Sequence, residues 1–329
     1  MASKSNIPFP SLLILFFKSV AGATLPELPV SSETISVSGI SSGGCFATQF
    51  HVAFSSTING VGSFAGCPYL SGPLGLDVPT LLDATVELAE RGAIDPISEL
   101  VGDDVFIFQG RSDPIVPWEN ARLIHQFYSA FTNEEKIMEK SDLEASHGFP
   151  TRGFGCDCDQ LCPPFYINNC NYDGAKAVLE QMLSSSSNNG TATQAFEGKL
   201  TAFDQDEFFD GDAGGKSMAD QGYLYVPDQC ASGQIACHLH FNFHGCTTGS
   251  SWIGNNYIQH SGLLQAADAN NMVVVFPQTL PSFSNPLGCW DWWGYLGDTE
   301  GHAFATKRGL QMQGIAAMLQ RVSGVSGFY

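Results

Sequence analysis

A G-x-S-x-G pentapeptide, Gly39-Ile40-Ser41-Ser42-Gly43, lies near the beginning of the chain. In this pattern a serine can stand on a sharp strand-to-helix turn, where its hydroxyl is exposed and small neighbours let the strained turn form. Backbone N–H groups at the start of the helix then face a developing oxyanion. Because glycine and serine are common residues, an ordinary glycine-rich turn is the alternative. We interpret Ser41 as a candidate nucleophile for acyl transfer.

A nucleophilic serine needs a base, and the base needs a carboxylate that orients it. Asp113 lies in the loop after the apolar run 105–108, at the carboxyl end of a predicted buried strand, where open α/β sheets place their chemistry. His147 follows after a further helix and a weak strand, in a glycine-containing loop, which matches the order Ser, Asp, His of α/β-hydrolases. An aspartate before proline can also be a plain turn former. The other histidines lie on predicted helices or strands, or outside the position expected for the base.

Two groups of side chains resemble metal ligands, but only weakly. His238 and His240 alternate along a predicted strand and mimic metal spacing together with His244, yet ordinary strand histidines are the preferred interpretation. The four cysteines within 156–170 could hold zinc in a cytosolic protein, whereas an exported chain would join them in disulfides. We therefore predict no metal and no cofactor.

The elements that must position these residues alternate between strands and helices, which predicts a single α/β domain. Residues 150–220 break this pattern and are predicted to form an irregular, cysteine-rich excursion with one short helix near 174–184. Strands 222–227 and 238–243 are expected in hairpin-like succession. The remaining predicted strands are 34–38, 61–66, 105–108, 136–139 and 272–276, and the remaining helices are 43–55, 79–91, 123–131, 263–269 and 306–322.

The order of the elements is unusual for an α/β-hydrolase. The His-Gly turn that forms the oxyanion hole normally precedes the nucleophile, but here the matching segment His240–Cys246 follows the candidate histidine. About half of the chain remains after His147. The simplest explanation is circular permutation, which chain ends that lie close together on a surface permit. We therefore predict a permuted α/β-hydrolase fold with a mostly parallel central sheet.

The composition limits the possible partners. The chain has 329 residues, with 33 acidic and 14 basic side chains and 43% hydrophobic residues. Such an acidic protein cannot hold nucleic acid by neutralising phosphates, and it gains no attraction to an anionic membrane surface. A neutral ester substrate suits this charge balance best, and we expect a monomer.

The N-terminus and the cysteines both indicate export. Residues 1–23 have a lysine at position 4, an apolar stretch and the cleavage pattern Ala21-Gly22-Ala23, which predicts a secretory signal followed by a catalytic domain over 24–329. Ten cysteines then indicate disulfides, with Cys230–Cys237 the best local pair. Asn189 begins a glycosylation sequon.

With these features in place, the chain resembles the secreted, circularly permuted poly(3-hydroxybutyrate) depolymerases, which are single-domain α/β-hydrolases. The resemblance covers nearly all of residues 25–329. It depends on four segments that match that family: 36–44, 217–227, 243–246 and 288–295. Cys45 and Cys67 depart from the family pattern and suggest an extra disulfide, and the cysteine-rich insert at 156–170 departs from it as well.

The resemblance implies Ser41 as nucleophile, Asp113 as the acid and His147 as the base. It also implies an oxyanion hole made by the backbone N–H groups of Ser42 and Cys246. The aromatic substrate-binding region of the family corresponds to Trp290, Trp292 and Trp293. The implied reaction is hydrolysis of a polyester or its oligomers through an acyl-enzyme. The alternatives are an esterase for small or plant-wall esters such as feruloyl or acetyl esters, a peptidase, and a secreted non-catalytic binder.

Overall fold

A computed structural model describes residues 23–71, 77–184, 197–297 and 299–326. The predicted signal peptide, apart from Ala23, and the sequon residue Asn189 lie outside these ranges. Within the described ranges, no helix is both long enough and apolar enough to cross a bilayer.

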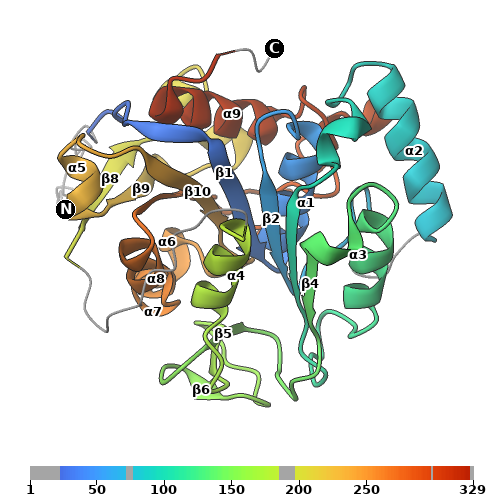
Figure 1. Ribbon diagram of the computed structural model, residues 1–329, viewed down its shortest axis with the longest axis horizontal. Helices are drawn as coiled ribbons and strands as arrows, with labels where there is room; N and C mark the ends of the chain where they lie inside the picture. The colour runs from blue at the N-terminus through green and yellow to red at the C-terminus, as the bar shows by residue number, and fades with distance from the viewer. Residues whose placement is uncertain (1–22, 72–76, 185–196, 298, 327–329) are drawn as a thin grey trace, which may run out of the picture.

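An eight-stranded sheet runs through the molecule in the order β4-β3-β2-β1-β10-β11-β9-β8 (Figure 1). The six strands from β4 to β11 are parallel to their neighbours, and β9 and β8 are added antiparallel at one edge. The strands are β1 Val30–Ile40, β2 Gly60–Phe64, β3 Asp104–Phe108, β4 Ile137–Lys140, β8 Lys199–Asp204, β9 Gln221–Val226, β10 Cys237–Phe243 and β11 Met272–Phe276.

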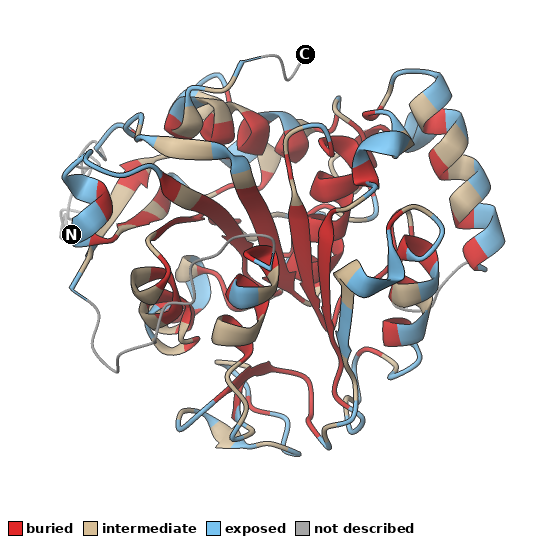
Figure 2. Ribbon diagram, in the orientation of Figure 1, coloured by how far each residue is buried: buried red, intermediate tan, exposed pale blue. Residues whose placement is uncertain are grey.

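This strand order confirms the predicted mostly parallel α/β fold and shows how the permuted sequence closes into it. β1, the first strand of the chain, lies at the centre of the sheet, and its partner β10 comes about 200 residues later. Residues 35–40 of β1 and nearly all of β10 are buried, which Figure 2 shows as a red centre. The carboxyl ends of β1 and β10 therefore meet, although the sequence separates them widely.

Helices cover both faces of the sheet (Figure 1). Each face has its own apolar cluster, because alternate side chains of a strand point to opposite faces. One face carries α1 Ser42–Ala53, α2 Val78–Glu90, α3 Asn120–Tyr128 and α9 Leu310–Ser323. The other carries α4 Gly174–Met182, α6 Ser250–Ile253, α7 Asn256–His260 and α8 Leu263–Ala269, while the short α5 Asp228–Ala231 precedes β10.

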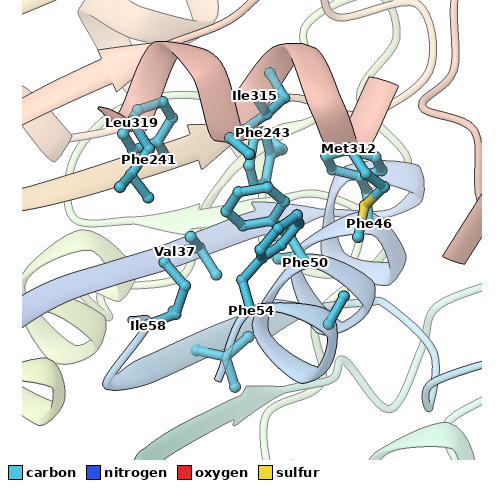
Figure 3. Packing of buried hydrophobic residues seen from close by; sticks show 14 of the residues in the cluster. Val37, Phe46, Phe50, Phe54, Ile58, Phe241, Phe243, Met312, Ile315 and Leu319 are labelled. Atoms are coloured by element: carbon cyan, nitrogen blue, oxygen red, sulfur yellow. The ribbon is translucent and has the colours of Figure 1, made fainter. Parts of the chain in front are cut away.

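A column of phenylalanines anchors α1 to the sheet. Phe46, Phe50 and Phe54 recur every four residues, so they share one helical face and are fully buried. Phe46 meets Phe243 of β10 edge to face, with ring centroids 5.0 Å apart, and Ile315 of α9 belongs to the same cluster (Figure 3). Each such buried ring contributes about 1.5–3 kcal/mol of transfer free energy. These contacts fix α1 on the sheet and thereby fix the turn at its start.

Two predictions about the second half of the chain were wrong. β9 and β10 do not form a hairpin, because β9 pairs with β8 and β11 while β10 pairs with β1 and β11. The excursion is also less irregular than predicted. It supplies β8 to the main sheet and forms a separate three-stranded sheet of β5 Phe149–Thr151, β6 Cys156–Asp157 and β7 Ile167–Asn169.

All ten cysteines are paired in disulfides. The predicted pairs Cys230–Cys237 and Cys45–Cys67 are both present. The cluster within 156–170 forms two crossed bridges, Cys156–Cys162 and Cys158–Cys170, so these thiols are not available to a metal. The fifth bridge joins Cys246 to Cys289.

Candidate active site

Ser41 lies on the sharp turn between β1 and α1, as the pentapeptide predicts. Its backbone has φ 58° and ψ −122°, a strained conformation for a residue with a side chain. The flanking glycines are required by close backbone approach. A Cβ on Gly39 would lie 2.2 Å from the Gly43 carbonyl oxygen, and a Cβ on Gly43 would lie 2.2 Å from the Phe243 carbonyl oxygen. The turn is therefore pressed against the end of β10.

Asp113 is held in the loop after β3 by four hydrogen bonds. Its Oδ1 accepts the backbone N–H groups of Ile115 and Val116, each at 2.8 Å. Its Oδ2 accepts from Gln109 Nε2 at 3.1 Å and from His147 Nδ1 at 2.8 Å. The Asp113 side chain is 1% exposed, so it presents a fixed, buried carboxylate to one nitrogen of the His147 ring.

Ser41 and His147 line one cavity of about 270 Å³, and Asp113 is bonded to His147 behind it. Ser41 is partly exposed, and His147 is 4% exposed. In the described chain no direct hydrogen bond joins the Ser41 hydroxyl to the His147 ring. Such bonds are often long in the absence of substrate and tighten when it binds. The structure thus brings together all three predicted triad members.

The disulfide-linked insert holds the His147 loop from both sides. The Ser146 N–H donates to the Cys158 carbonyl at 2.7 Å, and the Phe149 N–H donates to the Tyr166 carbonyl at 2.8 Å. The Tyr166 ring stands edge-on to the His147 ring, with centroids 6.0 Å apart, and lines the cavity. The insert therefore forms one wall of the site and does not stand apart from it (green, below the sheet in Figure 1).

The predicted oxyanion turn lies directly beside Ser41. Gly39 of β1 is paired with Phe243 of β10, so the residues after each strand are neighbours. A Cβ on Gly245 would lie 3.3 Å from the Ser41 Cβ, and Cys246 lines the same cavity. Ser42 is the first residue of α1, where backbone N–H groups have no partner within the helix.

The three tryptophans are not placed alike. Trp290 is completely buried and packs on Phe46 and Phe243, with ring centroids 4.7 and 4.9 Å away. It is a core residue, so the assignment of Trp290 to substrate binding was wrong. Trp293 is 39% exposed and Trp292 is partly buried, and their rings touch at 4.8 Å. Neither lines the cavity, so their role in binding polymer stays a prediction.

Sequence reasoning missed most of the cavity wall. The wall is mainly apolar and comes from seven separate segments of the chain. Ile115 and Leu287 are its exposed side chains, at 47% and 51% exposure, and the tyrosines Tyr166 and Tyr257 lie deeper. No local pattern marks these positions, because a residue joins a cavity through the fold of distant segments.

The histidines that resemble metal ligands are used in hydrogen bonds. His238 Nδ1 is 2.7 Å from Thr34 Oγ1, and the two nitrogens of His240 bond to serines of β1. Burial lowers the pKa of His240 to about 3 and that of His244 to about 4. Both rings are therefore neutral near neutral pH.

No family model matches the chain. The poly(3-hydroxybutyrate) depolymerase of Delftia acidovorans is 33% identical over 323 residues, which cover 93% of this chain but only 63% of that protein. The polyhydroxybutyrate depolymerase of Talaromyces funiculosus is 34% identical over 343 residues, covering 96% of this chain and 97% of that one.

Two solved structures are also similar. A PHB depolymerase carrying a serine-to-alanine substitution and complexed with an R3HB trimer has a TM-score of 0.82 and 31% identity. The PHB depolymerase from Penicillium funiculosum has a TM-score of 0.81 and 30% identity. Each comparison covers 92% of this chain and 99% of the other chain.

Proposed function

The chain belongs to the poly(3-hydroxybutyrate) depolymerase family, and we propose that it is a serine esterase that hydrolyses poly(3-hydroxybutyrate)-type polyesters or their oligomers. One observation carries this proposal: Ser41, His147 and the Cys246 turn line a single cavity, and Asp113 bonds to the nitrogen on the other side of the His147 ring. Nucleophile, base, orienting carboxylate and oxyanion donors are the four parts that acyl transfer needs.

The geometry assigns each residue a step. His147 takes the Ser41 proton through Nε2 as the serine oxygen attacks the ester carbonyl, because its Nδ1–H is already donated to Asp113. The backbone N–H groups of Ser42 and Cys246 receive the negative charge, and removing one such donor typically costs about 10²–10³ in kcat. His147 then protonates the leaving alcohol, and it later activates the water that releases the acyl group.

The cavity suits a short, uncharged acyl unit. Its wall is mostly aliphatic and aromatic, and Ile115 and Leu287 extend that character to its exposed edge. Phe283, four residues before Leu287, is fully exposed, and Trp252 of α6, six residues after Cys246, is 48% exposed. A neutral polymer can contact such apolar groups without any charged partner.

Export and the monomeric state are part of the same proposal. Five disulfides in the described chain are typical of proteins from oxidising compartments, which supports export. N-terminal sequencing of the exported protein tests the predicted cleavage, which would leave Thr24 as the first residue. Light scattering measures the oligomeric state.

A granule-clearing assay tests the activity. The native protein should clear a suspension of poly(3-hydroxybutyrate) granules and release oligomers, whereas Ser41→Ala should do neither while keeping its fold. Ser129→Ala, an exposed serine at the end of α3, is the matched control and should clear normally. Aryl butyrate, feruloyl and acetyl esters and a peptide are run alongside. If the protein cleaves one of these compounds and does not clear granules, that compound class would replace the polyester as the proposed substrate.

A serine-reactive phosphonate separates an enzyme from a binder. It should label the native protein and not Ser41→Ala. A native protein that binds granules but takes no label and cleaves no ester would be a non-catalytic binder.

A further inference from the structure

The mechanism above leaves one buried side chain beside the site without a role. His244 is 1% exposed and directly precedes Gly245-Cys246, the turn whose last N–H is assigned to the oxyanion. Its ring has two polar partners, and together they determine which nitrogen carries the proton.

The backbone N–H of Thr279 lies 3.1 Å from His244 Nε2 and can only donate, so Nε2 must be the acceptor. The Thr279 hydroxyl donates to the Gly288 carbonyl at 2.6 Å, so it does not need the ring as an acceptor. The proton therefore resides on Nδ1, which donates to the Gly245 carbonyl at 2.7 Å. Burial keeps the pKa of this ring at about 4, so the neutral form persists at ordinary pH.

The Gly245 carbonyl accepts more than one hydrogen bond. Besides His244, it receives the Thr248 hydroxyl at 2.9 Å and the Thr248 N–H at 3.2 Å. The peptide bond between Gly245 and Cys246 is trans, because the only cis bond in the described chain joins two prolines. In a trans peptide the C=O and N–H groups point in opposite directions. Donors that hold the carbonyl on the protein side thus direct the Cys246 N–H to the other side, where Cys246 lines the cavity.

We propose that His244 is a positioning residue for the oxyanion hole: its Nδ1–H fixes the direction of the Cys246 N–H and polarises that peptide. Hydrogen bonds in a chain strengthen one another, so a carbonyl with several donors makes its own peptide N–H a better donor. The ring packs closely against Gly249, where an added Cβ would lie 2.6 Å from its Cε1, so this glycine makes the space that the ring occupies. The inference rests on the proposed esterase function and assigns a further residue to the same site.

A pair of isosteric variants tests the inference. Asparagine places an amide nitrogen where Nδ1 stands, and glutamine places an amide oxygen where Nε2 stands. His244→Asn can therefore keep the donor to Gly245 and lose the acceptor for Thr279, whereas His244→Gln does the reverse. Each variant loses one buried hydrogen bond, so their thermal midpoints should fall by similar amounts, and any difference in kcat reports the donor to Gly245.

We expect His244→Gln to lower kcat on an aryl butyrate by about 10- to 100-fold, somewhat less than outright loss of a donor, with KM nearly unchanged. His244→Asn should keep a kcat at least about tenfold above that of His244→Gln. The inhibition constant of an alkyl boronic acid, which forms a tetrahedral adduct on Ser41, should rise in His244→Gln in parallel with the fall in kcat. His240→Gln is the control, a buried histidine outside the site, and should lower the thermal midpoint without lowering kcat.

Equal kcat values for the two variants, or a His244→Gln enzyme with native kcat, would overturn the inference. If neither variant folds, Thr248→Val decides. It removes only the hydroxyl donor to the Gly245 carbonyl, and it should lower kcat severalfold with an unchanged KM. An unchanged kcat in a folded Thr248→Val would then refute the idea. A native protein without esterase activity would instead refute the proposed function, so the two failures are distinguishable.

Discussion

Replacing Asp113 by asparagine is expected to lower kcat for ester hydrolysis by about 10⁴-fold, as a wrong histidine tautomer does in other triads. The structure dictates how the new amide sits. Oδ1 of Asp113 accepts two backbone N–H groups, from Ile115 and Val116, and only the amide oxygen can replace it there. The amide nitrogen must then occupy the Oδ2 position, 2.8 Å from His147 Nδ1.

An N–H group at that position turns His147 Nδ1 into an acceptor and moves the ring proton to Nε2. The ring then cannot take the proton of Ser41, because the nitrogen that faces the cavity already carries one. A factor of 10⁴ corresponds to about 5.4 kcal/mol of transition-state stabilisation. The new amide also meets the donor Gln109 Nε2, so the variant should lose roughly 1–3 kcal/mol of stability and remain folded.

The assay measures kcat and KM on an aryl butyrate, with thermal unfolding to confirm the fold. Asp77→Asn is the matched control. Asp77 caps α2 by accepting the Thr80 N–H, and asparagine caps a helix about equally well, so kcat should not change. A folded Asp113→Asn enzyme with kcat within about tenfold of the native value would contradict the roles assigned to both Asp113 and His147.

Three further predictions follow from other contacts. Gly43→Ala should lower the free energy of unfolding by more than about 4 kcal/mol in a denaturant titration, because its Cβ would overlap the Phe243 carbonyl. The control Gly214→Ala, whose Cβ would meet nothing within 4 Å, should be neutral. Equal stabilities of the two variants would contradict the close packing. The pKa of His240 is about 3 in the folded state and 6.5 in the unfolded chain, so the unfolded chain takes up the proton first as the pH falls. The free energy of unfolding therefore decreases between pH 6.5 and pH 3, by up to about 1.4 kcal/mol per pH unit. In His240→Gln the thermal midpoint should depend less on pH between 6.5 and 3 than in the native protein. An unchanged pH dependence would show that another group is responsible. Replacing both Cys158 and Cys170 by serine should lower kcat by about 10- to 100-fold, because the Cys158 carbonyl holds the loop that carries His147. A native kcat in the folded double variant would rule this out.

Local sequence patterns predicted most elements, and they pointed to Ser41, Asp113 and His147 as candidate site residues. The turn at Ser41 depends on neighbouring glycines, Asp113 follows a strand whose apolar run is visible in the sequence, and His147 lies in a glycine-containing loop after a weak strand. Helix 263–269 and strand 272–276 begin and end where predicted. These features depend on interactions within a few residues, which a sequence displays directly.

Pairing between distant segments could not be derived in this way. β8 was missed because its partner β9 begins 17 residues after it ends, across a polar stretch that itself forms no strand. The tryptophans at 290 and 293 are three residues apart with the same chemistry. Packing against Phe46 of α1 and Phe243 of β10 decides that the first is buried. The insert lines the site only because of where its carbonyls meet the loop of the base.

The sequence by itself determined which groups could react and in what order the chain presents them. The tertiary structure decided which of them meet, which nitrogen of His147 and of His244 carries a proton, and what shape of substrate the cavity admits. The physical reason is that reactivity is a property of a residue and its near neighbours. A cavity, by contrast, is formed by the packing of strands and loops far apart along the chain, and no local pattern encodes that packing.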